Sequence, residues 1–222
     1  MARVNYSSAF AITALTIILM LVSSSAFARP VSYPDGWTVM QKNNPDVNSL
    51  HVHYSPTAKY SVGYKAEYWR EEEWQGHYVK LNYLGKRWNM PKSQANFYVK
   101  SGLGVAYSDF DQFDSQTEPA AFTGIALDWE DRRYFTAYEN RVTYAGDIAE
   151  EFRQSAKVGI APYIGDYGDL HTWLMFHVEH TPKEEGDEIT YMPMVRFFKD
   201  VYLVELGITD DGEGMANFIV RF

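Results

Sequence analysis

The last nine residues, Gly214-Met-Ala-Asn-Phe-Ile-Val-Arg-Phe222, decide the fold of the chain. Side chains alternate between the two faces of an extended strand, so every second residue shares a face. One face of this stretch is apolar and consists of Ala216, Phe218, Val220 and Phe222. The other face is mixed and consists of Met215, Asn217, Ile219 and Arg221. The chain therefore ends in a predicted strand that separates an apolar surface from a partly charged one.

The same period of two recurs along most of the chain and predicts further strands. In 59–69, for example, Tyr60, Val62 and Tyr64 lie on one face, and Lys65 and Glu67 lie on the other. We expect about twelve strands, or ten if the first two short stretches form a plug. The expected strands are 36–42, 49–55, 58–69, 76–88, 95–108, 119–129, 132–145, 151–166, 170–181, 188–198, 200–209 and 214–222.

The first 28 residues have the pattern of a secretory signal peptide. Arg3 precedes a short apolar run at 9–22, and Ala26-Phe27-Ala28 forms an A-x-A cleavage site. The alternative is an uncleaved membrane anchor, but the run is short for a spanning helix. We therefore expect 1–28 to be removed on export and 29–222 to form one domain.

Composition narrows the classes of function. The formal net charge is −9 at pH 7, which argues against nucleic acid as a partner. The chain has no cysteine, so it offers neither a disulfide nor a thiolate metal site. Its 17 tyrosines, 13 phenylalanines and 6 tryptophans suit a membrane barrel, in which aromatic residues gather at both interfaces.

Alternating strands also build soluble sandwiches and soluble barrels, in which the apolar face points inward. Other features of the sequence must therefore show whether the apolar face points inward or outward. The polar faces carry single Lys, Arg and Glu residues beside Gly and Ala, as a partly wet barrel interior does. Short and longer connections also alternate along the chain, and the longer ones are acidic. They contain Glu71, Glu72, Glu73, Asp109, Asp111, Asp114, Glu150, Glu151, Glu184, Glu185, Asp187, Glu188, Asp210, Asp211 and Glu213. These features favour a barrel with its apolar face outward.

A final alternating strand with Phe218, Val220 and Phe222 resembles the C-terminal strand of Gram-negative outer-membrane β-barrel proteins. The resemblance implies an all-β chain that forms a closed antiparallel transmembrane β-barrel over 29–222, with short periplasmic turns and longer outer loops. It implies the outer membrane as the location. It also implies membrane lipid, lipopolysaccharide and the barrel assembly machinery as partners, with Phe218, Val220 and Phe222 as the assembly signal.

Histidines and methionines gather on the predicted inner face. His51 and His53 lie about 7 Å apart on one side of a strand, and thioethers with imidazoles suit copper. The candidate metal residues are His51, His53, His171, Met175, His177, Glu179, Met192 and Met194. The alternative is a wall in which Met fills gaps. In a round barrel the second and ninth strands lie on nearly opposite walls, too far apart to share one ion.

Charges of both signs also face inward and form either a selectivity surface or a set of ion pairs that seals the lumen. The main candidates are Lys65, Glu67, Lys100, Glu139, Arg141 and Arg196. Trp69, Trp74, Trp88 and Trp129 lie near strand ends and are interpreted as interface anchors. The acidic loops are capable of attracting divalent cations, although charge runs are commonly solvated.

Three functions follow in order of preference. The first is a non-catalytic barrel that admits or binds a small solute or ion, with copper-type metal handling as its sharper version. The second is a sealed structural or adhesive barrel with contact loops. The third is a lipid-modifying enzyme, which the chain supports least because it contains no nucleophile motif near His77 or His180.

Overall fold

The computed structural model describes residues 31, 33–108, 115–166, 168–183 and 186–222, and the expected signal peptide at 1–28 lies outside the described residues. These residues contain twelve strands and no helix, and therefore no helix long and apolar enough to cross a membrane. The strands are β1 (Gly36–Asn43), β2 (Val47–Ser55), β3 (Tyr60–Trp69), β4 (Trp74–Asn89), β5 (Ser93–Ser108), β6 (Gln116–Asp131), β7 (Tyr134–Ala145), β8 (Ala149–Ile160), β9 (His171–Thr181), β10 (Glu188–Lys199), β11 (Tyr202–Ile208) and β12 (Gly214–Arg221).

The sheet is a closed antiparallel barrel in which each strand pairs with its neighbours along the chain. The first strand closes it, because β1 pairs with both β2 and β12. At the closure the Trp37 N–H donates to the Phe222 carbonyl at 2.6 Å, and the Phe222 N–H donates to the Trp37 carbonyl at 3.1 Å. The expectation of an all-β, twelve-stranded barrel is confirmed. The plug alternative is wrong, since both short stretches at the start of the chain are barrel strands.

The first residue of β1 and the last residue of β12 lie at the same end of the barrel, here called the terminal end. The connections at this end join β2 to β3, β4 to β5, β6 to β7, β8 to β9 and β10 to β11. Most are short, but β8 stops at Ile160 and β9 starts at His171. The predicted strand 151–166 is therefore too long at its C-terminal end. Pro162 has no N–H to donate to a ladder, and Gly168 has a φ of 86°, so the chain leaves the sheet early.

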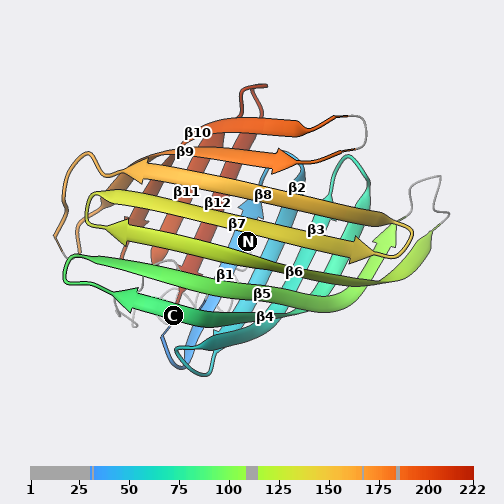
Figure 1. The fold of residues 1–222 in the computed structure, drawn as a ribbon, viewed down its shortest axis with the longest axis horizontal. Coiled ribbons are helices and arrows are strands. Elements are labelled where there is room, and N and C mark those ends of the chain that lie inside the picture. Colours follow the sequence, from blue (N-terminus) through green and yellow to red (C-terminus); the bar gives the residue numbers. More distant parts are fainter. Residues whose placement is uncertain (1–30, 32, 109–114, 167, 184–185) are drawn as a thin grey trace, which may run out of the picture.

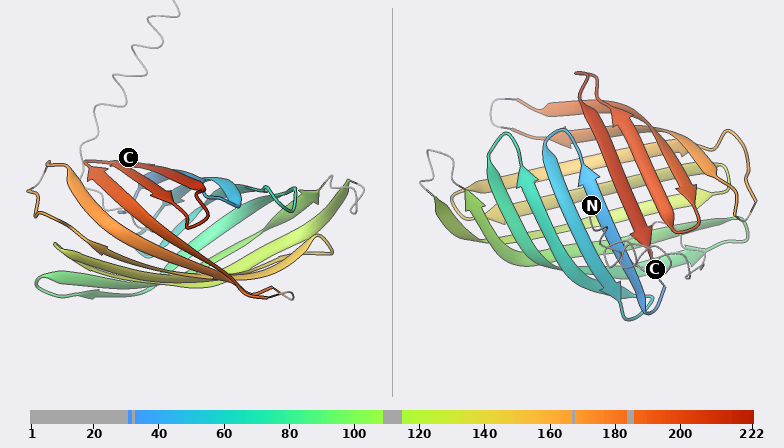
Figure 2. Two further views of the ribbon diagram at one scale, coloured as in Figure 1. Left: turned by 90° about the horizontal axis from the view of Figure 1, so that it is seen from above. Right: turned by 180° about the vertical axis from the view of Figure 1, so that it is seen from behind.

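The barrel is flattened rather than round. Figure 1 shows β5 to β10 crossing in front of β1 to β3, β11 and β12, and the edge-on view in Figure 2 shows the two walls close to each other. The strands of the two walls run at a steep angle to each other. As a result, side chains from strands far apart in the barrel order meet across the interior.

Large apolar side chains cover the outside of the barrel on every strand. Leu103 on β5 is 72% exposed and Val79 on β4 is 66% exposed. Other exposed members include Trp37, Leu50, Tyr64, Leu127, Val142, Val158, Leu174, Ile189, Leu206 and Phe218. Such an apolar band is far larger than the patches that soluble monomers expose.

At the end opposite the terminal end, here called the far end, aromatic side chains fill part of the interior. Trp69 at the end of β3 stacks on Trp74 at the start of β4, with ring centroids 5.2 Å apart. Both are almost fully buried in a cluster with Tyr78 and Phe122. The interpretation of Trp69 and Trp74 as interface anchors is therefore wrong. Each shares the inward phase of its strand, Trp69 with Glu67 and Trp74 with Tyr78.

Close packing of β4 against β5 requires glycine at position 104. A Cβ on Gly104 would meet the backbone carbonyl oxygen of His77 on the neighbouring strand, and backbone cannot turn aside as a side chain can. Gly214, at the start of β12, has no atom within 4 Å of the corresponding point.

We expect Gly104→Ala to lower the free energy of unfolding by about 1–3 kcal/mol through overpacking. Gly214→Ala is the matched control and should change it by less than about 0.5 kcal/mol. Denaturant unfolding of both refolded variants, followed by tryptophan fluorescence, measures the difference. Equal stability of the two variants would contradict the close approach of the strands.

Candidate functional site

A cavity of about 790 Å³ runs inside the barrel. At the terminal end its wall includes residues of several connections, among them Lys92, Arg132, Asp166 and Asp169. It extends between the walls as far as Val47 and Trp69 near the far end. The cavity therefore opens among the turns of the terminal end and narrows toward the far end.

The mouth of the cavity is acidic. Asp128, Glu130 and Asp131 come from the last residues of β6, and they are joined by Asp166, Asp169 and Asp200. Arg132 at the same mouth reaches Asp166 at 3.6 Å and donates to the Gly165 carbonyl at 3.0 Å. Solvent reaches these groups from the turns, so the field at the mouth is screened by salt.

One ion-pair cluster crosses the barrel from β3 to β7. Arg141 on β7 donates through both terminal nitrogens to the two carboxylate oxygens of Glu67 on β3, each at 2.6 Å. Lys65 also pairs with Glu67. The Arg141 guanidinium lies 4.2 Å from the ring centroid of Phe122, so a cation–π contact adds to the ion pair. This bidentate pair fixes the distance between the two walls.

A second cluster surrounds Arg153 on β8. Arg153 donates to Asp46 in the β1–β2 connection at 2.8 Å and to Glu179 on β9 at 2.7 Å. It also donates to Glu151 at 2.9 Å, and its guanidinium lies 4.8 Å from the ring centroid of Trp69. Three carboxylates thus surround one guanidinium at the narrow end of the cavity. We call Arg153, Asp46, Glu151 and Glu179 the Arg153 cluster.

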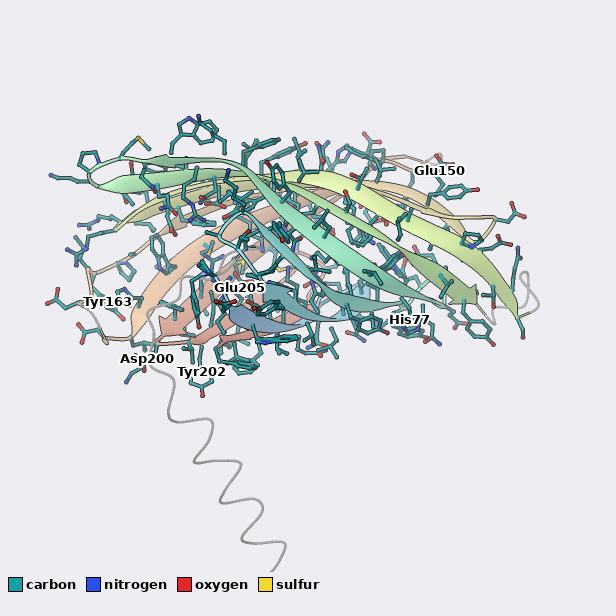
Figure 3. The ribbon with its side chains drawn as sticks, turned by 90° about the horizontal axis from the view of Figure 1, so that it is seen from below. His77, Glu150, Tyr163, Asp200, Tyr202 and Glu205 are labelled. Carbon is teal, nitrogen blue, oxygen red and sulfur yellow. The ribbon has the colours of Figure 1, made fainter. Side chains whose placement is uncertain are left out.

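Further pairs line the rest of the wall. Arg196 on β10 donates to Glu205 on β11 at 2.6 Å, and Lys157 on β8 lies 3.9 Å from the same carboxylate. Figure 3 shows Glu205 between the two walls of the barrel. Lys100 on β5 pairs with Glu139 on β7 at 2.7 Å. The interior is therefore polar and charged, while the outside is apolar.

A much smaller pocket of about 40 Å³ lies beyond the cavity at the far end. It shares Asn44, His177 and Glu179 with the wall of the large cavity and is also lined by Glu213. Its size admits only one or two water molecules. The Arg153 cluster, which includes Glu179, therefore lies where the two spaces meet and forms the constriction.

The predicted metal residues lie on the inner face but do not converge. His51, His53, His171 and His177 all line the cavity. His171 and His177 are six residues apart along β9, or about 20 Å, so they cannot share an ion. In the described part of the chain, no group of three or more His, Asp or Glu residues is arranged to hold a metal. The copper-type site stays a prediction, and the arrangement of His, Asp and Glu side chains in the described residues does not support it.

Four methionines form a separate buried cluster. Met175 on β9, Met192 and Met194 on β10, and Met215 on β12 pack together beside Phe135 and Trp173. A hydrogen bond from the Asn217 amide reaches the Met215 sulfur at 3.5 Å. These flexible apolar side chains pack the interior between β9 and β12. This agrees with the alternative interpretation, in which Met fills gaps in the wall.

All six of the predicted lumen charges line the cavity: Lys65, Glu67, Lys100, Glu139, Arg141 and Arg196. Their role as a selectivity surface stays a prediction. Sequence reasoning missed Lys42, Asp46 and Arg153, and it assigned Glu151 to an outer loop. The phase of Lys157 would have found Arg153 and Glu151, because all three lie at odd positions of one strand.

Several acidic residues at the far end already have basic partners. His180 lies 3.2 Å from Asp187, and Lys183 pairs with Glu188 at 2.5 Å. The hydrogen bond to Glu188 raises the pKa of Lys183. Five other acidic residues of the predicted outer loops lie outside the described residues: Asp109, Asp111, Asp114, Glu184 and Glu185. Attraction of cations to the acidic loops stays a prediction.

The two histidines near the rims have partners that do not suggest catalysis. His77 shares a hydrogen bond of 2.5 Å with the Tyr64 hydroxyl on the outer surface, and His180 bonds to the Gln154 amide at 2.9 Å. Ser108 donates to the Glu73 carbonyl instead of to an imidazole. Neither His77 nor His180 has a described serine as its hydrogen-bond partner.

No protein-family model matches the chain, and no curated protein matches it either. Among solved structures, OccK8 (OprE) of Pseudomonas aeruginosa matches with a TM-score of 0.43 and 8% sequence identity. The match covers 79% of this chain and 57% of that chain, so the chain spans little more than half of the length of OccK8. The barrel fold itself rests on the strand pairing described above.

The pair between Glu67 and Arg141 should dominate the stability of the interior. We expect Glu67→Gln to lower the free energy of unfolding by about 3 kcal/mol, because it leaves Lys65 and Arg141 without their counter-charge. Glu150→Gln, on the outer face of β8, is the matched control and should stay within about 0.5 kcal/mol. Denaturant titrations in detergent micelles test this. A similar loss in both variants would mean that the cluster contributes no more than a surface charge.

Proposed function

We propose that the chain is a non-catalytic outer-membrane β-barrel that admits small hydrophilic solutes through its lumen. The observation that carries this proposal is the inverted polarity of the barrel: apolar side chains outside on all twelve strands, and ion pairs around a cavity of about 790 Å³ inside. A soluble barrel would bury the apolar face instead. Only a closed sheet leaves no unpaired backbone edge in lipid.

The location and the partners are part of the same proposal. The pattern at 1–28 and the strand that ends in Phe222 support export to a Gram-negative outer membrane and insertion by the barrel assembly machinery. In that setting the outer apolar band contacts lipid and lipopolysaccharide. The terminal end then faces the periplasm, and the far end faces the outside.

Passage through the barrel depends on the Arg153 cluster. The large cavity reaches the turns of the terminal end, while the far end is narrowed by side chains of Arg153, Asp46 and Glu179. The contacts that define this constriction join side chains, so opening a path there requires side chains to rearrange and leaves the sheet intact. The sealed-barrel alternative holds that this cluster never opens.

The first experiment is planar-bilayer recording of the refolded protein without its first 28 residues. We expect discrete conductance steps of small size, because the constriction is charged and narrow. A folded protein with no conductance in either the wild type or the variant described next would refute the pore and leave a sealed barrel.

Arg153→Ala removes the centre of the constriction, and we expect it to raise single-channel conductance at least about twofold. Arg133→Ala, on the exposed β6–β7 turn, is the matched control and should leave conductance unchanged. Folding of each variant is checked by its heat-modifiable mobility on electrophoresis. An unchanged conductance in well-folded Arg153→Ala would contradict the assignment of the constriction.

A further inference from the structure

Polar side chains cross the outer surface of the barrel at the middle of four neighbouring strands. Each lies within one residue of the midpoint of its strand. They are Ser101 on β5, Thr123 on β6, Asn140 on β7 and Gln154 on β8. We call these four residues the polar row. The midpoint of a strand that crosses a membrane lies near the middle of the bilayer, where polar groups meet no water.

The polar row has the outward phase of its strands. Leu103, Val142 and Val158 lie two or four residues from members of the row and are 72%, 45% and 54% exposed. Residues at even separations share a face of the sheet, so the row points outward with them. Asn140 and Gln154 also border the cavity, since the backbone of a strand belongs to both faces.

The row is confined to one part of the outer surface. The other eight strands have apolar or aromatic residues at the outward position next to their midpoints. These residues are Val39, Leu50, Tyr64, Leu81, Phe176, Pro193, Leu206 and Phe218. The outer face of β5 to β8 therefore differs from the rest of the outer surface at the depth where hydrocarbon surrounds the barrel.

Hydrogen bonds within the sheet use only part of the capacity of the row. The Ser101 and Thr123 hydroxyls share one bond of 3.0 Å, which leaves one hydroxyl hydrogen. The Asn140 amide donates to a tyrosine hydroxyl at 3.4 Å, and the Gln154 amide donates to Nδ1 of His180 at 2.9 Å. Among the described residues, each amide thus uses one of its two hydrogens. Hydrocarbon offers no acceptor for the remaining ones, so their exposure to lipid is costly.

A second copy of the same surface offers the partners that lipid lacks. Amides and hydroxyls both donate and accept, so the row is able to pair with its own symmetry copy. Such a contact is isologous, because residue i meets residue j and residue j meets residue i. The outward positions of β5 to β8 carry charge only at Asp131 and Glu150, at strand ends. Two copies would therefore bring no like charges together at the centre of the contact.

The shape and size of the surface also suit a second barrel. In Figure 1, β5 to β8 lie side by side in one broad wall of the flattened barrel. Ala121 and Ala156, two residues from Thr123 and Gln154 on the same face, are small and allow close approach. Four strands about 4.8 Å apart, with an apolar band about 25 Å tall, cover about 500 Å². Two copies would bury about 1,000 Å², the lower bound for a specific interface.

We propose that the outer face of β5 to β8 is the interface of a two-fold dimer within the membrane, with the polar row at its centre. The inference rests on the proposed function for the membrane location alone. Association of two barrels requires no conductance, and conductance requires no second copy, so the two proposals fail separately.

The first test is sedimentation equilibrium of the refolded protein without its first 28 residues, in a mild detergent over a range of protein concentrations. Gln154→Leu removes an amide from the centre of the row. Gln75→Leu makes the same change on the outer face of β4 near the far end, outside the row, and is the matched control. We expect the wild type and Gln75→Leu to form dimers of equal affinity, and Gln154→Leu to dimerise at least about tenfold more weakly. Heat-modifiable mobility on electrophoresis checks that each variant is folded.

The second test places a single thiol on the surface, because the chain has no cysteine. Thr123→Cys lies in the row, and Leu206→Cys lies on the outer face of β11 and is the control. Both proteins are reconstituted in liposomes at high lipid excess and treated with a short bismaleimide. We expect Thr123→Cys to give crosslinked dimers at least about tenfold faster than Leu206→Cys.

Three results would overturn the proposal. They are a wild type that is monomeric at every concentration, equal dimer affinity in Gln154→Leu and the wild type, and equal crosslinking of the two cysteine variants. In each case lipid, and not a second copy, covers the row. Dimers without any conductance would refute the pore and leave the interface intact, whereas a conducting monomer would refute the interface and leave the pore.

Discussion

Backbone hydrogen bonding between β1 and β12 is the constraint on which the rest of the structure depends. It removes the last free edge of the sheet, so every strand has a neighbour on both sides. Once the sheet is closed, each strand has one face toward the interior and one face outward, and the period of two assigns every residue to one of them. The placement of charge and of apolar area follows from this assignment.

The interior then has to compensate for the charges that it encloses. Glu67, Glu179 and Glu205 each accept hydrogen bonds from arginine, and two of these carboxylates connect strands that are not neighbours in the barrel: Glu67 to β7 and Glu205 to β8 through Lys157. Interior stability is therefore electrostatic as well as hydrophobic.

Local alternation was sufficient to predict about twelve strands and the inward side of Lys65, Lys100 and Arg141, whereas the closed antiparallel barrel was implied by the resemblance of the C-terminal strand. It could not predict which charges meet, because contacts such as Arg141 with Glu67 depend on how far the barrel flattens. Trp69 and Trp74 were misplaced because aromatic residues near strand ends suit both a membrane interface and a packed interior. Strand β8 was set too long because Ile160 and Ile164 keep the period past the point where Pro162 ends the ladder.

Because the cross-section is flattened, the number of strands alone does not determine the width of the passage. Twelve strands fix the perimeter of the barrel, but an ellipse encloses less area than a circle of equal perimeter. Side-chain bridges such as Arg141 with Glu67 hold the walls together across the short axis. Ionic bridges across the short axis thus help to set the bore, so two barrels of equal strand number differ in passage width when their bridges differ.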